Sequence, residues 1–189
     1  MNFPERYKAE IVSAVESIDL GEVNEVIELF KLARSRGHSI FICANTNSGR
    51  TASRVVSDMM TRSSLGRSAR FRVMTLHNGP PVSPSGQDSG DGEGVFVEQL
   101  KNFAEPNDVV VGISASVDSS SIARALDYGA CIGCKTVALA GLDGGQLGAL
   151  ADITVHVAST RPGTVEDTQI IICHLIGSYF LDFDCQPVP

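Results

Sequence analysis

Five serines lie close together in one short segment, and hydroxyl groups at that density suggest an anion-binding site. The segment, residues 112–126, reads GISASVDSSSIARAL: an apolar run carries Ser114 and Ser116 at its end, and Ser119 opens a helical pattern. Phosphate binds at such helix N-termini, because the orphan N–H groups and the helix dipole both favour an anion. The alternative is a serine-rich helix cap without a ligand, and Asp118 would repel a phosphate if its carboxylate faced it.

A second polar turn, ANTNSG at residues 44–49, also follows an apolar run and precedes a helical pattern. Asn45 and Ser48 there can hydrogen-bond sugar hydroxyls or phosphate oxygens, and they can equally act as turn formers and an N-cap. The chain contains neither a P-loop nor a G-x-G-x-x-G motif. No motif therefore supports nucleotide binding.

Cys131 and Cys134 form the one C-x-x-C pair among five cysteines. One interpretation is that the two cysteines form a redox pair or half of a zinc site. No second C-x-x-C is present to complete a zinc site. The other interpretation, which we favour, is that the small residues of GACIGCK allow a helix to pack tightly against a strand. A chain of this length with few cysteines is expected to hold them as reduced thiols.

Composition indicates one ordinary domain that does not bind nucleic acid through its whole surface. The 189 residues are 43% hydrophobic, which suffices for a sizeable core, and their formal charge of -7 has the wrong sign for a nucleic-acid surface. Four arginines between residues 62 and 72 form a local basic patch, read as a solvated face or a subunit contact. No apolar run approaches the roughly 18 residues of a membrane span, so we expect a soluble, cytoplasmic protein.

Short β-branched runs alternate with helical periodicity along most of the chain. The expected strands cover residues 39–43, 71–76, 108–114, 135–141 and 152–158, and the expected helices cover 4–18, 22–34, 51–62, 95–103, 119–130, 146–150 and 165–181. Runs such as VVVGI are apolar on both faces, which is typical of parallel strands covered by helices on both sides. The pattern predicts a doubly wound α/β sandwich around a five-stranded parallel sheet, with ligands beyond the carboxyl ends of the strands.

The sequence also predicts how the chain is divided into segments. Residues 1–36 are expected to form a leading helical pair, and the whole of residues 1–189 a single domain. The segment 79–94, GPPVSPSGQDSGDGEG, is rich in Gly, Pro and acids, and we expect a mobile loop near the site.

The segment GISASVDSSSIARALDYGACIGCKTVALAGLDGGQLGALADITVHV resembles the sugar isomerase (SIS) domain family, and within it the phosphoheptose isomerase group. The likeness covers nearly the whole chain and is closest in AGLDGGQLGALAD, residues 140–152. It implies a SIS fold with two leading helices and one long C-terminal helix. It also implies a phosphosugar substrate such as sedoheptulose 7-phosphate, and a homo-oligomer, typically a tetramer, whose sites are completed across subunits.

The family's phosphate-binding serines match Ser114, Ser116 and Ser119. Its C-G-N-G-G-S turn matches residues 43–48, where Asn45 and Ser48 are kept and all three glycines are lost. Less backbone can then approach a ligand at this turn.

The resemblance also implies catalytic roles. The family's glutamate base falls on Asp58, one methylene shorter, and its closing-helix histidine falls on His174, the expected acid. Arg54 stands where the family has a metal-site histidine. Glu166 stands where the family has a glutamine, and the resemblance implies that it contacts the substrate. Arg54 can instead form a plain i, i+4 ion pair with Asp58. The zinc ligands that remain are Asp58, Glu166 and His174, the last two about 12 Å apart along a helix axis, so zinc is left open and no cofactor is predicted.

Three hypotheses follow. The first is an aldose–ketose isomerase of a phosphosugar, with Asp58 and His174 facing the serines. The second is a non-catalytic SIS module that binds a phosphosugar or a protein, similar to bacterial replication-initiation regulators. It is favoured by the departures at the places where chemistry would occur, which include Arg54 and Asp58. The third, a nucleic-acid binder through the arginine patch, is the weakest.

Overall fold

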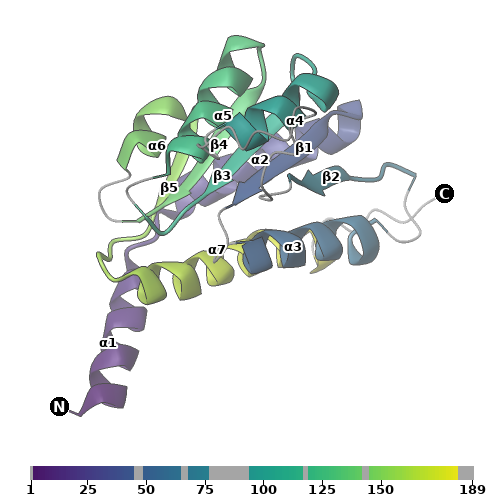
Figure 1. The fold of residues 1–189 in the computed structure, drawn as a ribbon. Helices are drawn as coiled ribbons and strands as arrows, with labels where there is room; N and C mark the ends of the chain where they lie inside the picture. The colour runs from purple at the N-terminus through teal and green to yellow at the C-terminus, as the bar shows by residue number, and fades with distance from the viewer. Residues whose placement is uncertain are drawn as a thin grey trace.

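The sheet has five parallel strands in the order β2-β1-β3-β4-β5 (Figure 1). The computed structural model describes residues 2–44, 49–64, 68–76, 94–116, 119–141 and 145–182. The strands are β1 Ser39–Ala44, β2 Arg72–Thr75, β3 Val109–Ile113, β4 Lys135–Ala140 and β5 Ile153–His156. β3 is buried along its whole length, as its unbroken apolar sequence predicts.

Helices cover both faces of the sheet. They are α1 Phe3–Glu16, α2 Leu20–Arg36, α3 Gly49–Ser57, α4 Val95–Phe103, α5 Ser120–Cys131, α6 Gly145–Leu150 and α7 Pro162–Asp182, with a π-helical turn η1, Asp58–Arg62, after α3. One core cluster joins α2, α3, η1 and α7 to one face of the sheet, and a second joins α4, α5 and α6 to the other. Figure 1 shows these three layers, with α1 extending away from the body.

The first two helices begin where their sequences provide caps. The Asn2 side chain accepts from the backbone N–H of Glu5, and the Glu5 carboxylate accepts from the N–H of Asn2, which completes a capping box. The Asp19 carboxylate caps α2, and Gly37 ends α2 in the left-handed conformation that glycine adopts at low cost.

The predicted doubly wound sandwich with two leading helices and one long closing helix is confirmed. Two details differ from expectation. α7 begins three residues earlier than predicted, at Pro162, and the predicted helix 51–62 ends as η1 instead of continuing as α-helix. The predicted loop 79–94 lies outside the described residues except for Gly94. Among the helices described, none is long and apolar enough to cross a membrane.

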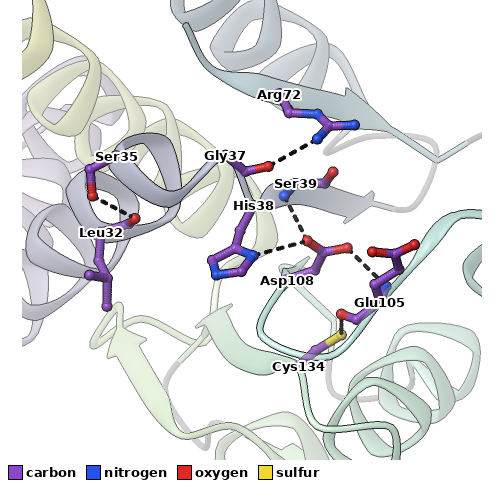
Figure 2. A network of polar contacts seen from close by, with 9 residues as sticks. All are labelled: Leu32, Ser35, Gly37, His38, Ser39, Arg72, Glu105, Asp108 and Cys134. Carbon is purple, nitrogen blue, oxygen red and sulfur yellow. Dashed lines mark hydrogen bonds and ion pairs between the residues drawn. The ribbon is translucent and has the colours of Figure 1, made fainter. Parts of the chain in front are cut away.

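A buried carboxylate joins β1 and β3 at the amino edge of the sheet (Figure 2). Asp108 is 5% exposed, and its two carboxylate oxygens accept the backbone N–H groups of Ser39 at 2.7 Å and Glu105 at 2.9 Å. The His38 imidazole lies 4.0 Å from the same carboxylate. Asp108 thereby supplies acceptors for backbone donors that lie beyond the ladder, where the sheet itself provides none.

Removing this carboxylate should destabilise the sheet without touching its carboxyl edge. We expect Asp108→Ala to lower the free energy of unfolding by about 2 kcal/mol, because two partly buried N–H groups lose a charged acceptor. Asp108→Asn, which keeps one acceptor oxygen, should cost roughly half as much. Urea denaturation followed by circular dichroism measures both. The exposed Asp127→Asn is the control, and an equal loss in all three variants would contradict the assignment.

Candidate active site

The carboxyl ends of β1 and β3 meet at the point where the strand order reverses. β1 pairs with β2 on one side and with β3 on the other, so the chain leaves these two neighbouring strands toward opposite faces of the sheet. Ligands of doubly wound sheets bind in the crevice that forms at such a point. Ser114 directly follows β3 there. Asn45 and Ser48, predicted on the turn after β1, lie outside the described residues.

The serine loop, defined here as residues 114–116 with Ser119, is held by its own hydroxyl groups. The Ser114 Oγ accepts the backbone N–H of Ser116 at 3.0 Å and lies 3.0 Å from the Ser116 carbonyl oxygen. It also contacts the Ser119 Oγ. Ser114 and Ser119 are buried, whereas Ser116 is exposed. These three serines are the ones predicted from the sequence, and the structure brings them together.

The loop leads directly into α5, a helix of 12 residues. Ser119 is the N-cap residue, and its side chain makes no capping hydrogen bond to the helix. Its hydroxyl is directed to Ser114 and lies 3.3 Å from the Ser116 carbonyl oxygen. The positive end of the α5 dipole is therefore placed beside exposed Ser116 at the ligand-binding edge of the sheet.

A residue that sequence analysis missed contacts this loop from α7. The Gln169 amide is buried, and its Nε2 donates to the carbonyl oxygens of Ser114 at 2.8 Å and Leu139 at 3.0 Å. No local motif marks it, since a single glutamine in an apolar helix is compatible with many roles. Only the fold brings α7 against the ends of β3 and β4.

Asp58 opens the π-helical turn η1. Its carbonyl oxygen accepts the backbone N–H of Ser63 at 2.9 Å, five residues ahead, and its carboxylate accepts Arg54 Nε at 3.0 Å. The ion pair predicted from the i, i+4 spacing is therefore present. The Asp58 side chain is 14% exposed and that of Arg54 61%, so the carboxylate lies mostly below the surface with the guanidinium above it. π-Helical turns often occur at functional sites.

His174 and Glu166 lie on α7, which packs against both α3 and η1. Glu166 is partly buried, and His174 is exposed on the outer side of the helix. Exposed Ile171 and Leu175 flank His174 on that side. The histidine therefore lies on an apolar surface that a second chain could cover.

The described residues of the single chain do not form a metal site. Within the six described segments, no three His, Cys, Asp or Glu side chains lie close enough to hold a metal ion, and Asp58, Glu166 and His174 all belong to those segments. The Asp58 carboxylate already binds the Arg54 guanidinium, which cannot ligate a metal. The zinc left open by the sequence gains no support here.

A family model and several known proteins match this chain over most of its length. The SIS domain family model matches residues 5–141. The chain belongs to the SIS domain family. A phosphoheptose isomerase of Geobacter sp. (strain M21) is 30% identical over 172 residues, which are 90% of this chain and 88% of that one. Within the SIS family, the chain is thus similar to the phosphoheptose isomerase group.

Solved structures show how widely this SIS fold is shared. A phosphoheptose isomerase from Neisseria gonorrhoeae superposes with a TM-score of 0.81 at 21% identity, over 95% of this chain and 98% of that one. The Vibrio vulnificus NanR protein complexed with ManNAc-6P superposes with a TM-score of 0.68 at 9% identity, over 96% of this chain and 62% of that one. At such identities the likeness shows the fold alone.

The C-x-x-C pair does not have the features of a redox site. Cys131 is the exposed last residue of α5, and Cys134 is buried with its thiol donating to the Glu105 carbonyl oxygen at 3.3 Å (Figure 2). Burial, together with the Asp108 charge, raises the pKa of Cys134 to about 11. Reactive pairs have lowered thiol pKa values. The packing interpretation of GACIGCK is the one that the structure favours.

Thiol alkylation should follow this burial. Burial raises the pKa of Cys173 to about 12 and that of Cys43 well above its usual range, so at pH 8 these thiols and Cys134 are almost entirely protonated. We expect iodoacetamide at pH 8 to modify Cys131 at least about tenfold faster than Cys43, Cys134 and Cys173, as peptide mapping by mass spectrometry would measure. Comparable rates at Cys131 and Cys134 would contradict the assignment.

Proposed function

We propose that this SIS domain protein is an aldose–ketose isomerase of a phosphosugar, acting on sedoheptulose 7-phosphate or a closely similar substrate. The observation that carries the proposal is the serine loop, whose hydroxyl groups gather beside the N-terminus of α5 at the ligand-binding edge of the sheet. The likeness to phosphoheptose isomerases supports the choice of substrate.

In this proposal the phosphate binds at the serine loop. Ser116 is the exposed hydroxyl of the loop, while buried Ser114 and Ser119 hold its backbone in place. The N-terminus of α5 contributes dipole and N–H donors, which favour a dianion without any basic side chain. Asn45 and Ser48 are proposed to contact the sugar from the neighbouring turn.

The reaction needs one group that moves a proton between carbons and another that moves a proton between oxygens through an enediol. We assign the first role to Asp58 and the second to His174. Arg54 orients the Asp58 carboxylate through its 3.0 Å ion pair, and a fixed orientation matters because a displacement on the order of 1 Å can cost about 100-fold in rate. No step requires a metal.

Deuterium exchange tests this assignment directly. In deuterated buffer, the protein should introduce solvent deuterium into sedoheptulose 7-phosphate, measured by NMR of the sugar. Asp58→Asn and His174→Ala should each slow the exchange by about 100-fold or more, the usual contribution of a positioned acid or base. A chelator should leave the rate unchanged.

The matched control is Glu98→Gln, an exposed carboxylate on α4 that should retain the full exchange rate. Exchange that survives in both Asp58→Asn and His174→Ala would show that other residues perform the chemistry.

We further propose that the protein is a homo-oligomer, with a tetramer favoured, in the cytoplasm. The outer side of α7 exposes Ile170, Ile171 and Leu175 together with His174. α1 contributes exposed Phe3 and Val12, although much of this helix extends away from the body (Figure 1). Apolar surface of this kind is usually covered by another chain, which would also enclose His174.

A charge on this face should separate the subunits. Light scattering after size exclusion should give four times the 20.0 kDa chain for the unaltered protein and a smaller mass for Ile171→Asp, with a loss of isomerase activity. The control is Phe103→Asp, which places the same charge at an exposed apolar position on the opposite face of the sheet. A protein that is monomeric at micromolar concentration would refute the oligomer proposal.

The second candidate is a non-catalytic SIS module that binds a phosphosugar or a protein. Two observations favour it: Arg54 engages the carboxylate that would act as base, and His174 is exposed in the single chain. Saturable binding of sedoheptulose 7-phosphate without deuterium exchange would select this candidate over the isomerase.

A further inference from the structure

Gln169 is the side chain through which α7 reaches the carboxyl edge of the sheet. It is 1% exposed, and it belongs neither to the predicted acid–base pair nor to the serines. Its Nε2 lies 2.8 Å from the Ser114 carbonyl oxygen and 3.0 Å from the Leu139 carbonyl oxygen. Both N–H bonds of the amide are therefore used, one on the loop after β3 and one on β4.

These two contacts occur where the β3–β4 pairing ends. The last backbone bond between the two strands runs from the Ser114 N–H to the Leu139 carbonyl oxygen, at 3.0 Å. Beyond it the chain turns into the serine loop, so the Ser114 carbonyl needs a donor from elsewhere. The Gln169 amide supplies that donor and also binds the Leu139 carbonyl, which makes it the final link between the strand ends.

The oxygen of the same amide supports a role for the two donors. The Gln169 Oε1 is buried, and it has no hydrogen-bond partner among the residues described. An unsatisfied buried acceptor is destabilising, and an apolar side chain of the same length would avoid that loss. A glutamine at this position is therefore poorly explained by packing alone, and well explained by a need for two N–H donors on one atom.

Through Ser114 the amide is connected to the rest of the serine loop. Ser114 is held at its N–H by Leu139 and at its carbonyl by Gln169, and its Oγ in turn accepts the Ser116 N–H and contacts the Ser119 Oγ. Ser119 is the residue from which α5 begins. The chain of contacts therefore runs from α7 through Ser114 to the N-terminus of α5.

We propose that Gln169 is a positioning residue that sets the geometry of the serine loop. The phosphate-binding site is then held in place by α7 as well as by α5. This inference rests on the proposed function for its effect on the substrate. Its geometric part, that the loop is ordered by Gln169, stands on the hydrogen bonds alone.

The test compares Gln169→Met with Thr168→Val. Methionine keeps the length and helix preference of glutamine and removes both donors along with the orphan acceptor, so the fold should survive with a melting temperature within about 4 °C of the unaltered protein. Thr168 is the adjacent buried polar residue on α7, and its hydroxyl donates within the helix, to the Thr164 carbonyl oxygen at 2.8 Å. It is the matched control for loss of a buried polar group on α7.

Two measurements are made on each variant. Amide hydrogen exchange followed by NMR should be at least about tenfold faster for the Ser116 N–H in Gln169→Met, and unchanged in Thr168→Val, because local order at the loop depends on the amide. Kinetics with sedoheptulose 7-phosphate should show a rise of about tenfold in KM with a smaller change in kcat, because the phosphate of the substrate is bound more weakly.

Failure of the inference is distinguishable from failure of the proposed function. Unchanged hydrogen exchange at Ser116 in Gln169→Met overturns the inference, whether or not the protein is an enzyme. The same holds for an unchanged KM in a protein that does turn over. Absence of turnover in the unaltered protein refutes the isomerase, and faster Ser116 exchange in Gln169→Met would still establish that Gln169 orders the loop.

Discussion

A parallel sheet covered on both faces leaves little room for polar side chains along its central strands, and this constraint limits where the protein can carry out chemistry. β3 is buried over its whole length, and its neighbours β1 and β4 are nearly so. Within the strands the backbone groups satisfy one another through the ladder. At the strand ends the ladder stops, and the remaining N–H and carbonyl groups need partners from side chains. Polar residues therefore concentrate at the two edges, and the structure uses each edge differently.

Between β1 and β3 the requirement is met at the amino edge by one carboxylate, and at the carboxyl edge by a network. Asp108 accepts the N–H groups of Ser39 and Glu105 in a buried setting, which fixes β1 beside β3. At the opposite edge the partners are hydroxyl and amide groups, from Ser114 and Ser119 of the serine loop and from Gln169 of α7. The first arrangement serves order in the sheet. The second shapes a surface that carries an exposed hydroxyl and the end of a helix dipole, which is what a phosphate ester requires.

Much of this organisation could be predicted from sequence, because it depends on local patterns. Apolar runs predict the strands, and the serine cluster before a helical pattern predicts the candidate anion-binding site. The Arg54–Asp58 pair follows from helical spacing. Other features depend on tertiary structure. Gln169 carries no local signal, since its partners are distant in sequence, and the π-helical turn at Asp58 has no pattern of its own. The exposure of His174 was equally hidden, because α7 is apolar on most of its circumference and periodicity does not distinguish its inner side.

The hydrogen bonds of the Asp108 carboxylate also affect how such a protein can evolve. It anchors two central strands from the edge opposite the candidate site, so part of the order of the sheet is independent of which residues occupy the turns at the site. Mutations in those turns can then accumulate singly, each tested by selection for what it binds and not for whether the chain folds. A scaffold with its stability anchored away from its binding surface can pass from one ligand to another, or from catalysis to regulation, through folded intermediates at every step.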